Sequence, residues 1–172
     1  PDPFFYASFL RPGGGRDWHG LGGRIHREQT DRFLEEGLRF LVTAGGYDAP
    51  AFLAYFLGLV SHYALDSQCH PYIYAFSGYR FNGEKPDFRR RYNHLMLEAI
   101  LDVIVFARAT GKDARQEKRW ERLPRQLDPS VGSFLQEALP ALYGTRLPGP
   151  DAMESILRDM RQGLRLLHDP TG

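Results

Sequence analysis

Apolar residues recur at helical spacing through most of the chain, and strict two-residue alternation is convincing nowhere. The pattern predicts helices at residues 24–44, 48–69, 87–110, 128–143 and 151–168. The fourth helix is expected to break near Pro140. We therefore expect one all-α domain over residues 1–172, built as a multi-helix bundle without internal repeats.

Glycine and proline residues set the expected boundaries of these helices. Residues 1–23, which hold three prolines and two glycine clusters, are predicted to form a loop. Gly45-Gly46 ends the first helix, and Asp48 is placed to cap the second. Pro71 follows the expected end of the second helix, and residues 72–87 form an aromatic loop.

The composition is that of an ordinary globular domain, with 42% apolar and 25% charged residues. A formal net charge of +1 gives no reason to expect a nucleic-acid partner. Cys69 is the only cysteine, so an intrachain disulfide is excluded, while redox compartment and localisation stay open. The longest apolar stretch, residues 51–65, is shorter than the roughly 20 residues of a membrane-spanning helix. We expect no transmembrane segment.

Two stripes of ionisable residues lie within strongly apolar helical segments. The first stripe is His62, Asp66 and His70, and the second is His94, Glu98 and Asp102. Each step of four residues drifts by only about 40° around a helix, so each stripe shares one face. An isolated buried charge costs several kcal/mol, so these groups must be paired, hydrated or bound to a metal. Imidazole nitrogen together with carboxylate oxygen favours zinc.

Metal-free pairing is the competing interpretation. For either pair alone, a hydrogen bond between His62 and Asp66, or between His94 and Glu98, is the simpler explanation. The two pairs together, with His70 and further ligand candidates upstream, favour a metal site.

Three other residues are candidates for the same site, and a fourth is set aside. His26 begins the first predicted helix, where alone it would be a surface histidine, and His19 in a glycine-rich loop is the reserve choice. Asp2 lies between two prolines, in an extended segment that can direct a carboxylate into a pocket. His168 is set aside, because a histidine in a last helical turn commonly binds backbone carbonyls.

Four segments, in order, resemble one known family. They are "PDPFFY" at residue 1, "RIHREQT" at residue 24, "FLGLVSHYALDSQCHPYIY" at residue 56 and "YNHLMLEAILD" at residue 92. The third holds H-Y-x-x-D followed by H-P-Y, and the fourth holds H-x-x-x-E-x-x-x-D. Together they resemble the bacterial uncharacterised branch of the zinc-dependent phospholipase C family, which is related to single-strand zinc nucleases. The resemblance covers roughly residues 1–105.

The resemblance implies an all-α fold of the zinc phospholipase C type that encloses up to three zinc ions. By position, one zinc would be bound by Asp2, His26, His62 and Asp66. Another would be bound by His94, Glu98 and a third histidine, to which we assign His70, although well-studied secreted members place it two residues later. The third zinc of the family uses the mature amino terminus and a histidine near it. The chain begins without Met, so we expect that it is truncated there and holds two zinc ions.

By the same resemblance the protein would be an enzyme that hydrolyses a phosphodiester, with zinc activating a water molecule. Asp2 is the candidate for the carboxylate that orients or deprotonates this water. The expected partner is a phosphate-ester substrate, which includes a phospholipid headgroup. The alternatives are a single-strand nuclease or nucleotidase with the same zinc cluster, a non-catalytic metal-stabilised helical module and a metal-free bundle. Nucleic acid is expected only for the nuclease, and the oligomeric state stays open.

Overall fold

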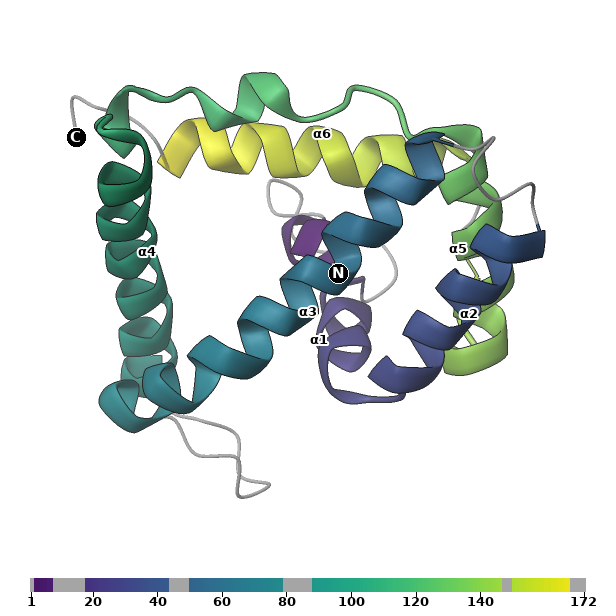
Figure 1. The fold of residues 1–172 in the computed structure, drawn as a ribbon, viewed down its shortest axis with the longest axis horizontal. Coiled ribbons are helices and arrows are strands. Elements are labelled where there is room, and N and C mark those ends of the chain that lie inside the picture. Colours follow the sequence, from purple (N-terminus) through teal and green to yellow (C-terminus); the bar gives the residue numbers. More distant parts are fainter. Residues whose placement is uncertain (1, 8–17, 44–49, 79–87, 147–149, 168–172) are drawn as a thin grey trace. The chain divides into compact units, whose positions relative to one another are not determined.

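A computed structural model describes residues 2–7, 18–43, 50–78, 88–146 and 150–167 (Figure 1). Its α-helices are α1 (Trp18–Arg27), α2 (Thr30–Thr43), α3 (Pro50–Ser77), α4 (Phe88–Thr110), α5 (Pro129–Tyr143) and α6 (Pro150–Leu167). Short 3-10 helices are η1 (Asp2–Tyr6), η3 (Ala114–Gln116) and η4 (Arg119–Arg122). Every regular element in the described ranges is helical, which confirms the predicted all-α class. None of these helices combines the length and apolarity that crossing a membrane requires.

The chain divides into two compact units. Unit 1 comprises Pro1–Val60 and Lys118–Gly172, and unit 2 comprises Ser61–Glu117. The division falls within α3, so this helix contributes residues to both units. The expectation of a single domain over residues 1–172 stays a prediction. The predicted helix boundaries at Gly45-Gly46 and Asp48 lie outside the described residues.

The segment predicted to be one helix at residues 24–44 is instead two helices. Gln29, between α1 and α2, has a φ of 53°, in the left-handed region that interrupts an α-helix. Its Nε2 donates to the Leu142 carbonyl at 2.6 Å, which anchors the turn on the end of α5. Because α1 already begins at Trp18, inside the predicted loop, His26 lies in the last turn of a helix and not at a helix start.

Two helices continue through a proline where the sequence predicted an end or a break. α3 runs past Pro71 to Ser77, and α5 runs past Pro140 to Tyr143. A proline in a helix interior removes one backbone hydrogen bond and costs about 3 kcal/mol. Ile73, Ser77 and Tyr143, which follow these prolines, are each only 4% exposed. Burial of the Ile73 and Tyr143 side chains offsets the lost bonds, a tertiary effect that the local sequence does not show.

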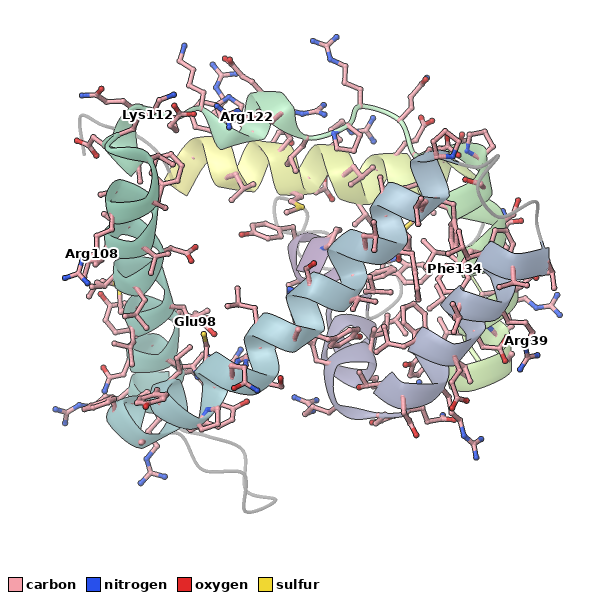
Figure 2. All side chains as sticks on the ribbon, viewed as in Figure 1. Arg39, Glu98, Arg108, Lys112, Arg122 and Phe134 are labelled. Atoms are coloured by element: carbon pink, nitrogen blue, oxygen red, sulfur yellow. The ribbon has the colours of Figure 1, made fainter. Side chains whose placement is uncertain are left out.

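Aromatic rings from α2, α3 and α5 form the core of unit 1. Phe134 points from α5 into this cluster (Figure 2) and is only 1% exposed. Its ring centroid lies 5.3 Å from those of Phe33 and Phe52. A Cβ atom at Gly37 of α2 would lie 2.6 Å from Cε2 of Phe56, so only glycine allows this approach of α2 and α3.

In the same unit, η1 packs against α1. Phe4 of η1 is 4% exposed. At Gly22 of α1, an added Cβ would lie 3.1 Å from Cβ of Phe4 and 3.3 Å from the Phe5 ring. This close contact seats η1, which begins at Asp2, on the helix that carries His26.

Unit 2 contains the second part of α3, together with α4 and η3. Both polar stripes lie in strongly apolar helical segments, for which burial is expected, but many apolar residues of these helices are exposed. Leu65, Leu95, Ile100 and Val105 keep between 49% and 64% of their surface exposed. An apolar sequence favours burial but does not supply a packing partner, and unit 2 has few elements that could cover one another.

Candidate metal centre

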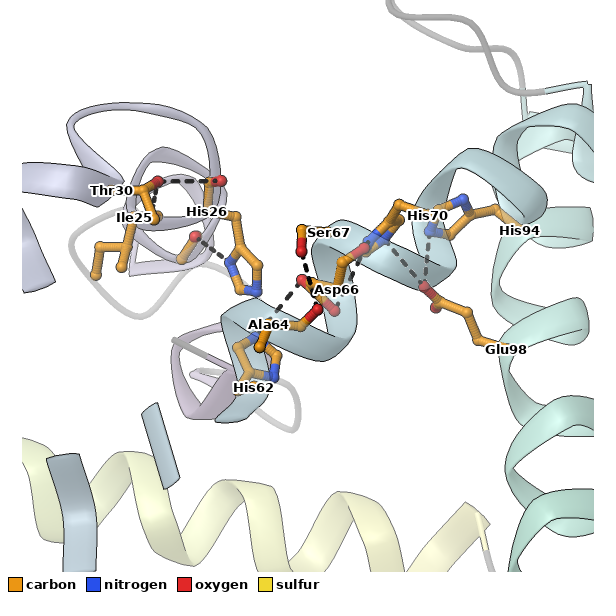
Figure 3. Close-up of polar contacts among 11 residues, drawn as sticks. Ile25, His26, Thr30, His62, Ala64, Asp66, Ser67, His70, His94 and Glu98 are labelled. Atoms are coloured by element: carbon orange, nitrogen blue, oxygen red, sulfur yellow. Dashed lines mark hydrogen bonds and ion pairs between the residues drawn. The ribbon is translucent and has the colours of Figure 1, made fainter. Parts of the chain in front are cut away.

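Two helices of unit 2 bring three metal-binding side chains together. Donor atoms of His70 from α3 and of His94 and Glu98 from α4 all lie within 4.8 Å of one another. The Oε1 atom of Glu98 lies 3.0 Å from Nε2 of His94 and 3.4 Å from Nε2 of His70 (Figure 3). All three side chains are half-buried. We refer to these three residues as the His70 centre.

The geometry of the His70 centre fits zinc. Four ligands at about 2.0–2.1 Å around a tetrahedral ion lie about 3.3 Å from one another, close to the separations of Glu98 from the two histidines. Two imidazoles and a carboxylate are ligands that zinc accepts, and three protein ligands leave a fourth position for water or substrate. The 3.0 Å separation of His94 and Glu98 is also a hydrogen-bond length, so measured metal content decides between zinc and metal-free pairing.

A backbone contact fixes the orientation of His70. Its Nδ1 lies 3.1 Å from the carbonyl oxygen of Asp66, one turn earlier in α3 (Figure 3). A carbonyl oxygen only accepts, so Nδ1 carries the proton and Nε2 has the lone pair that a metal requires. That nitrogen is the one beside Glu98. An anchored second nitrogen is the usual support of a metal-binding histidine.

The first predicted stripe is present as a continuous row on α3. Nε2 of His62 lies 3.6 Å from Oδ2 of Asp66, and Oδ1 of Asp66 lies 3.7 Å from Nδ1 of His70. Both distances exceed hydrogen-bond lengths. The carboxylate therefore lies between two imidazoles and has an oxygen directed toward each.

His26, in unit 1, is oriented in the same way as His70. Its Nδ1 lies 2.8 Å from the carbonyl oxygen of Gly22, one turn earlier in α1. This contact places the proton on Nδ1 and the lone pair on Nε2. The Phe5 ring packs beside the imidazole, with centroids 5.1 Å apart.

The remaining candidates are Asp2, His19, His168 and Asp102. The side chains of Asp2 and His19 lie outside the described part of the structure, and so does His168. Asp102 is exposed on α4 and belongs to none of the clustered donor groups found among the described residues. The second stripe therefore contributes His94 and Glu98, but not Asp102, to the His70 centre.

Tyr74 contacts both histidines of the His70 centre, which the sequence did not predict. It lies in α3 one turn after His70, in a segment expected to be a loop. Its ring centroid lies 5.0 Å from that of His70 and 5.5 Å from that of His94. The spacing of four residues between His70 and Tyr74 indicates that both lie on one helix face, but only if the helix continues through Pro71.

The described helices thus carry a His/His/Glu donor set that could hold a metal ion. The family model described as zinc-dependent phospholipase C matches residues 1–143. The chain belongs to this family of zinc-dependent phosphoesterases, which confirms the family that its four sequence segments resemble. No curated protein and no solved structure matches the chain.

Proposed function

We propose that the protein is a zinc-dependent enzyme of the phospholipase C type that hydrolyses a phosphodiester. The observation that carries this proposal is the convergence of His70, His94 and Glu98 from two helices. In a member of the zinc-dependent phospholipase C family, a donor set of this composition is the expected metal centre.

The proposal includes two zinc ions. The His70 centre binds one of them. Asp2, His26, His62 and Asp66 bind the other, as the family resemblance implies. Two contacts, each within a single unit, support this assignment: the carbonyl of Gly22 orients His26, and His62 lies beside Asp66.

Bound zinc would offset the negative charge of the phosphate and lower the pKa of a bound water towards about 7. The residues of the chain hold the metal ions and orient the water molecule. Glu98 supplies a negative charge to the cation, and the carbonyl of Asp66 keeps His70 in the correct tautomer. Asp2 is the proposed carboxylate that orients the attacking water and accepts its proton.

Metal content is the first test. Protein purified without chelator should contain about two zinc ions per chain by elemental analysis. Glu98→Gln should remove one of them. Asp102→Asn changes the exposed carboxylate one turn further along α4 and should retain both ions. Zinc content near zero in the unmodified protein would overturn the proposal.

Substrate class is the second test. Hydrolysis of a short-chain lecithin, lost in Glu98→Gln and kept in Asp102→Asn, would support the phospholipase C type. Cleavage of single-stranded DNA instead would support the nuclease alternative, for which Arg89, Arg90 and Arg91 at the exposed start of α4 provide cations. Zinc binding without either activity would point to a non-catalytic metal-stabilised module.

A further inference from the structure

Three aromatic rings lie against one another at the His70 centre. The centroids of His70 and His94 are 5.4 Å apart with an interplanar angle of 24°. Tyr74 lies 5.5 Å from His94 at 25° and 5.0 Å from His70 at 35°. We propose that Tyr74 is a positioning residue for zinc, which holds both imidazoles in the orientation that binds the ion. This inference rests on the proposed zinc site and adds to it a residue that acts through the ligands.

Ring packing of this kind restrains an imidazole without competing with the metal. The lone pair of a ring nitrogen lies in the ring plane, whereas the neighbouring ring contacts the face. For His70, the carbonyl of Asp66 contacts one edge and the Tyr74 ring lies beside it at a tilt of 35°, so the two contacts together restrict the orientation of the imidazole. For His94, Tyr74 and His70 both pack at small interplanar angles.

The continuation of α3 through Pro71 is what brings Tyr74 to this position. Four residues after His70, its side chain lies on the same helix face and reaches His94 of α4. Tyr72 is the same residue type on the same helix, but it lies two residues after His70 and is 69% exposed. Tyr72 is therefore a matched control for the loss of a tyrosine ring.

Zinc affinity tests the proposal directly. The metal-free full chain would be titrated with zinc against a chromophoric chelator. Tyr74→Leu should bind zinc about 10- to 100-fold more weakly, the usual effect of losing a residue that supports a metal ligand. Tyr74→Phe keeps the ring and should retain the affinity, as should Tyr72→Leu. Unchanged affinity in Tyr74→Leu would overturn the proposal, and so would an equal loss in Tyr74→Phe.

Cobalt(II) gives a readout that a loss of stability alone would not alter. Its visible absorption bands report the geometry of the ligands, so Tyr74→Leu at saturating cobalt should show changed bands and Tyr74→Phe should not. An unchanged spectrum in Tyr74→Leu would contradict a positioning role. Should that variant lose its helical circular dichroism, Tyr74→Met, whose flexible side chain fills space without a ring, takes its place in both measurements.

Zinc binding by the unmodified protein and by His94→Ala distinguishes a wrong role for Tyr74 from a wrong metal centre. If the unmodified protein binds zinc and His94→Ala binds one ion fewer, the His70 centre is supported independently of the result for Tyr74. If the unmodified protein binds no zinc, or His94→Ala binds as many zinc ions as the unmodified protein, the proposed His70 centre is wrong. The proposed role of Tyr74 is then wrong as well.

Discussion

The carboxylate of Asp66 lies between two imidazoles of α3, with Oδ2 3.6 Å from Nε2 of His62 and Oδ1 3.7 Å from Nδ1 of His70. The backbone carbonyl of the same residue lies 3.1 Å from Nδ1 of His70. In the proposed site, Asp66 would therefore serve the two zinc ions through different groups. Its side chain is a proposed ligand of one ion, and its carbonyl orients a proposed ligand of the other.

Asp66→Asn should separate these two roles. The substitution removes the charge but keeps the backbone carbonyl that orients His70. We expect the loss of one zinc ion, with the affinity of the His70 centre lowered by at most about 10-fold. Elemental analysis and zinc titration would measure both effects, with Ser67→Ala at the exposed neighbouring position as the control. Loss of both ions from Asp66→Asn would contradict this division of roles.

Zinc should stabilise the folded protein. A ligand that binds only the folded state raises the free energy of unfolding by about 2.7 kcal/mol at 100 times its Kd. Thermal unfolding followed by circular dichroism should therefore shift upwards with zinc and return with EDTA. Magnesium prefers octahedral oxygen coordination and should give no comparable shift. His94→Ala should reduce the response to zinc, and a response of full size in that variant would argue against the His70 centre.

Two glycines should respond in opposite ways to alanine. At Gly37 the new Cβ would lie 2.6 Å from Cε2 of Phe56, whose side chain is only 8% exposed. We expect Gly37→Ala to destabilise the protein by about 1–3 kcal/mol, because overpacking outweighs the helix-propensity gain. At Gly58 no described atom lies within 4 Å of the Cβ position, so Gly58→Ala should stabilise by about 0.5–1 kcal/mol. Urea unfolding of both variants would check the signs, and a stabilising Gly37→Ala would show that the packing of α2 on α3 relaxes readily.

The parts of the site that depend on local geometry were predictable. His62 with Asp66, and His94 with Glu98, lie close together because residues four apart share a helix face wherever the helix forms. The approach of His70 to Glu98 joins two helices, and no local rule decides which helices meet. Its prediction came from the family resemblance.

The parts that depend on distant contacts were not predictable. The turn at Gln29 is anchored on Leu142, 113 residues away, and the local sequence from residue 24 onwards is helical in pattern. Pro71 is a sound local stop signal, yet the burial of Ile73 beyond it outweighs the lost hydrogen bond. Because the helix was predicted to end before Pro71, Tyr74 was predicted to lie in a loop and not in α3.

Asp128 provides a pH-dependent contribution to stability at the start of α5. Its side chain accepts a hydrogen bond from the backbone N–H of Ser130 at 3.0 Å and another from the Ser130 hydroxyl. The hydroxyl bond first, and the backbone bond second, hold the pKa of Asp128 below its ordinary value of 3.8. Because the pKa is lower in the folded state, the ionised cap stabilises the protein above the unfolded pKa. This stabilisation is lost as the pH falls through the folded pKa.

Asp128→Asn should therefore show a pH-dependent difference in Tm from the unmodified protein. Asparagine caps a helix about as well as aspartate but does not titrate. We expect a constant difference in Tm between about pH 5 and 7, and a decrease as the pH falls below about 4, where an aspartate of the unfolded chain becomes protonated before Asp128 of the folded protein does. Ser130→Ala removes the hydroxyl bond, so it should raise the pKa of Asp128 toward 3.8, as measured by NMR titration. The decrease in Tm difference should then be smaller, because the folded and unfolded pKa values lie closer together. A difference in Tm that stays the same from neutral to acidic pH would show that the cap makes no charge-dependent contribution.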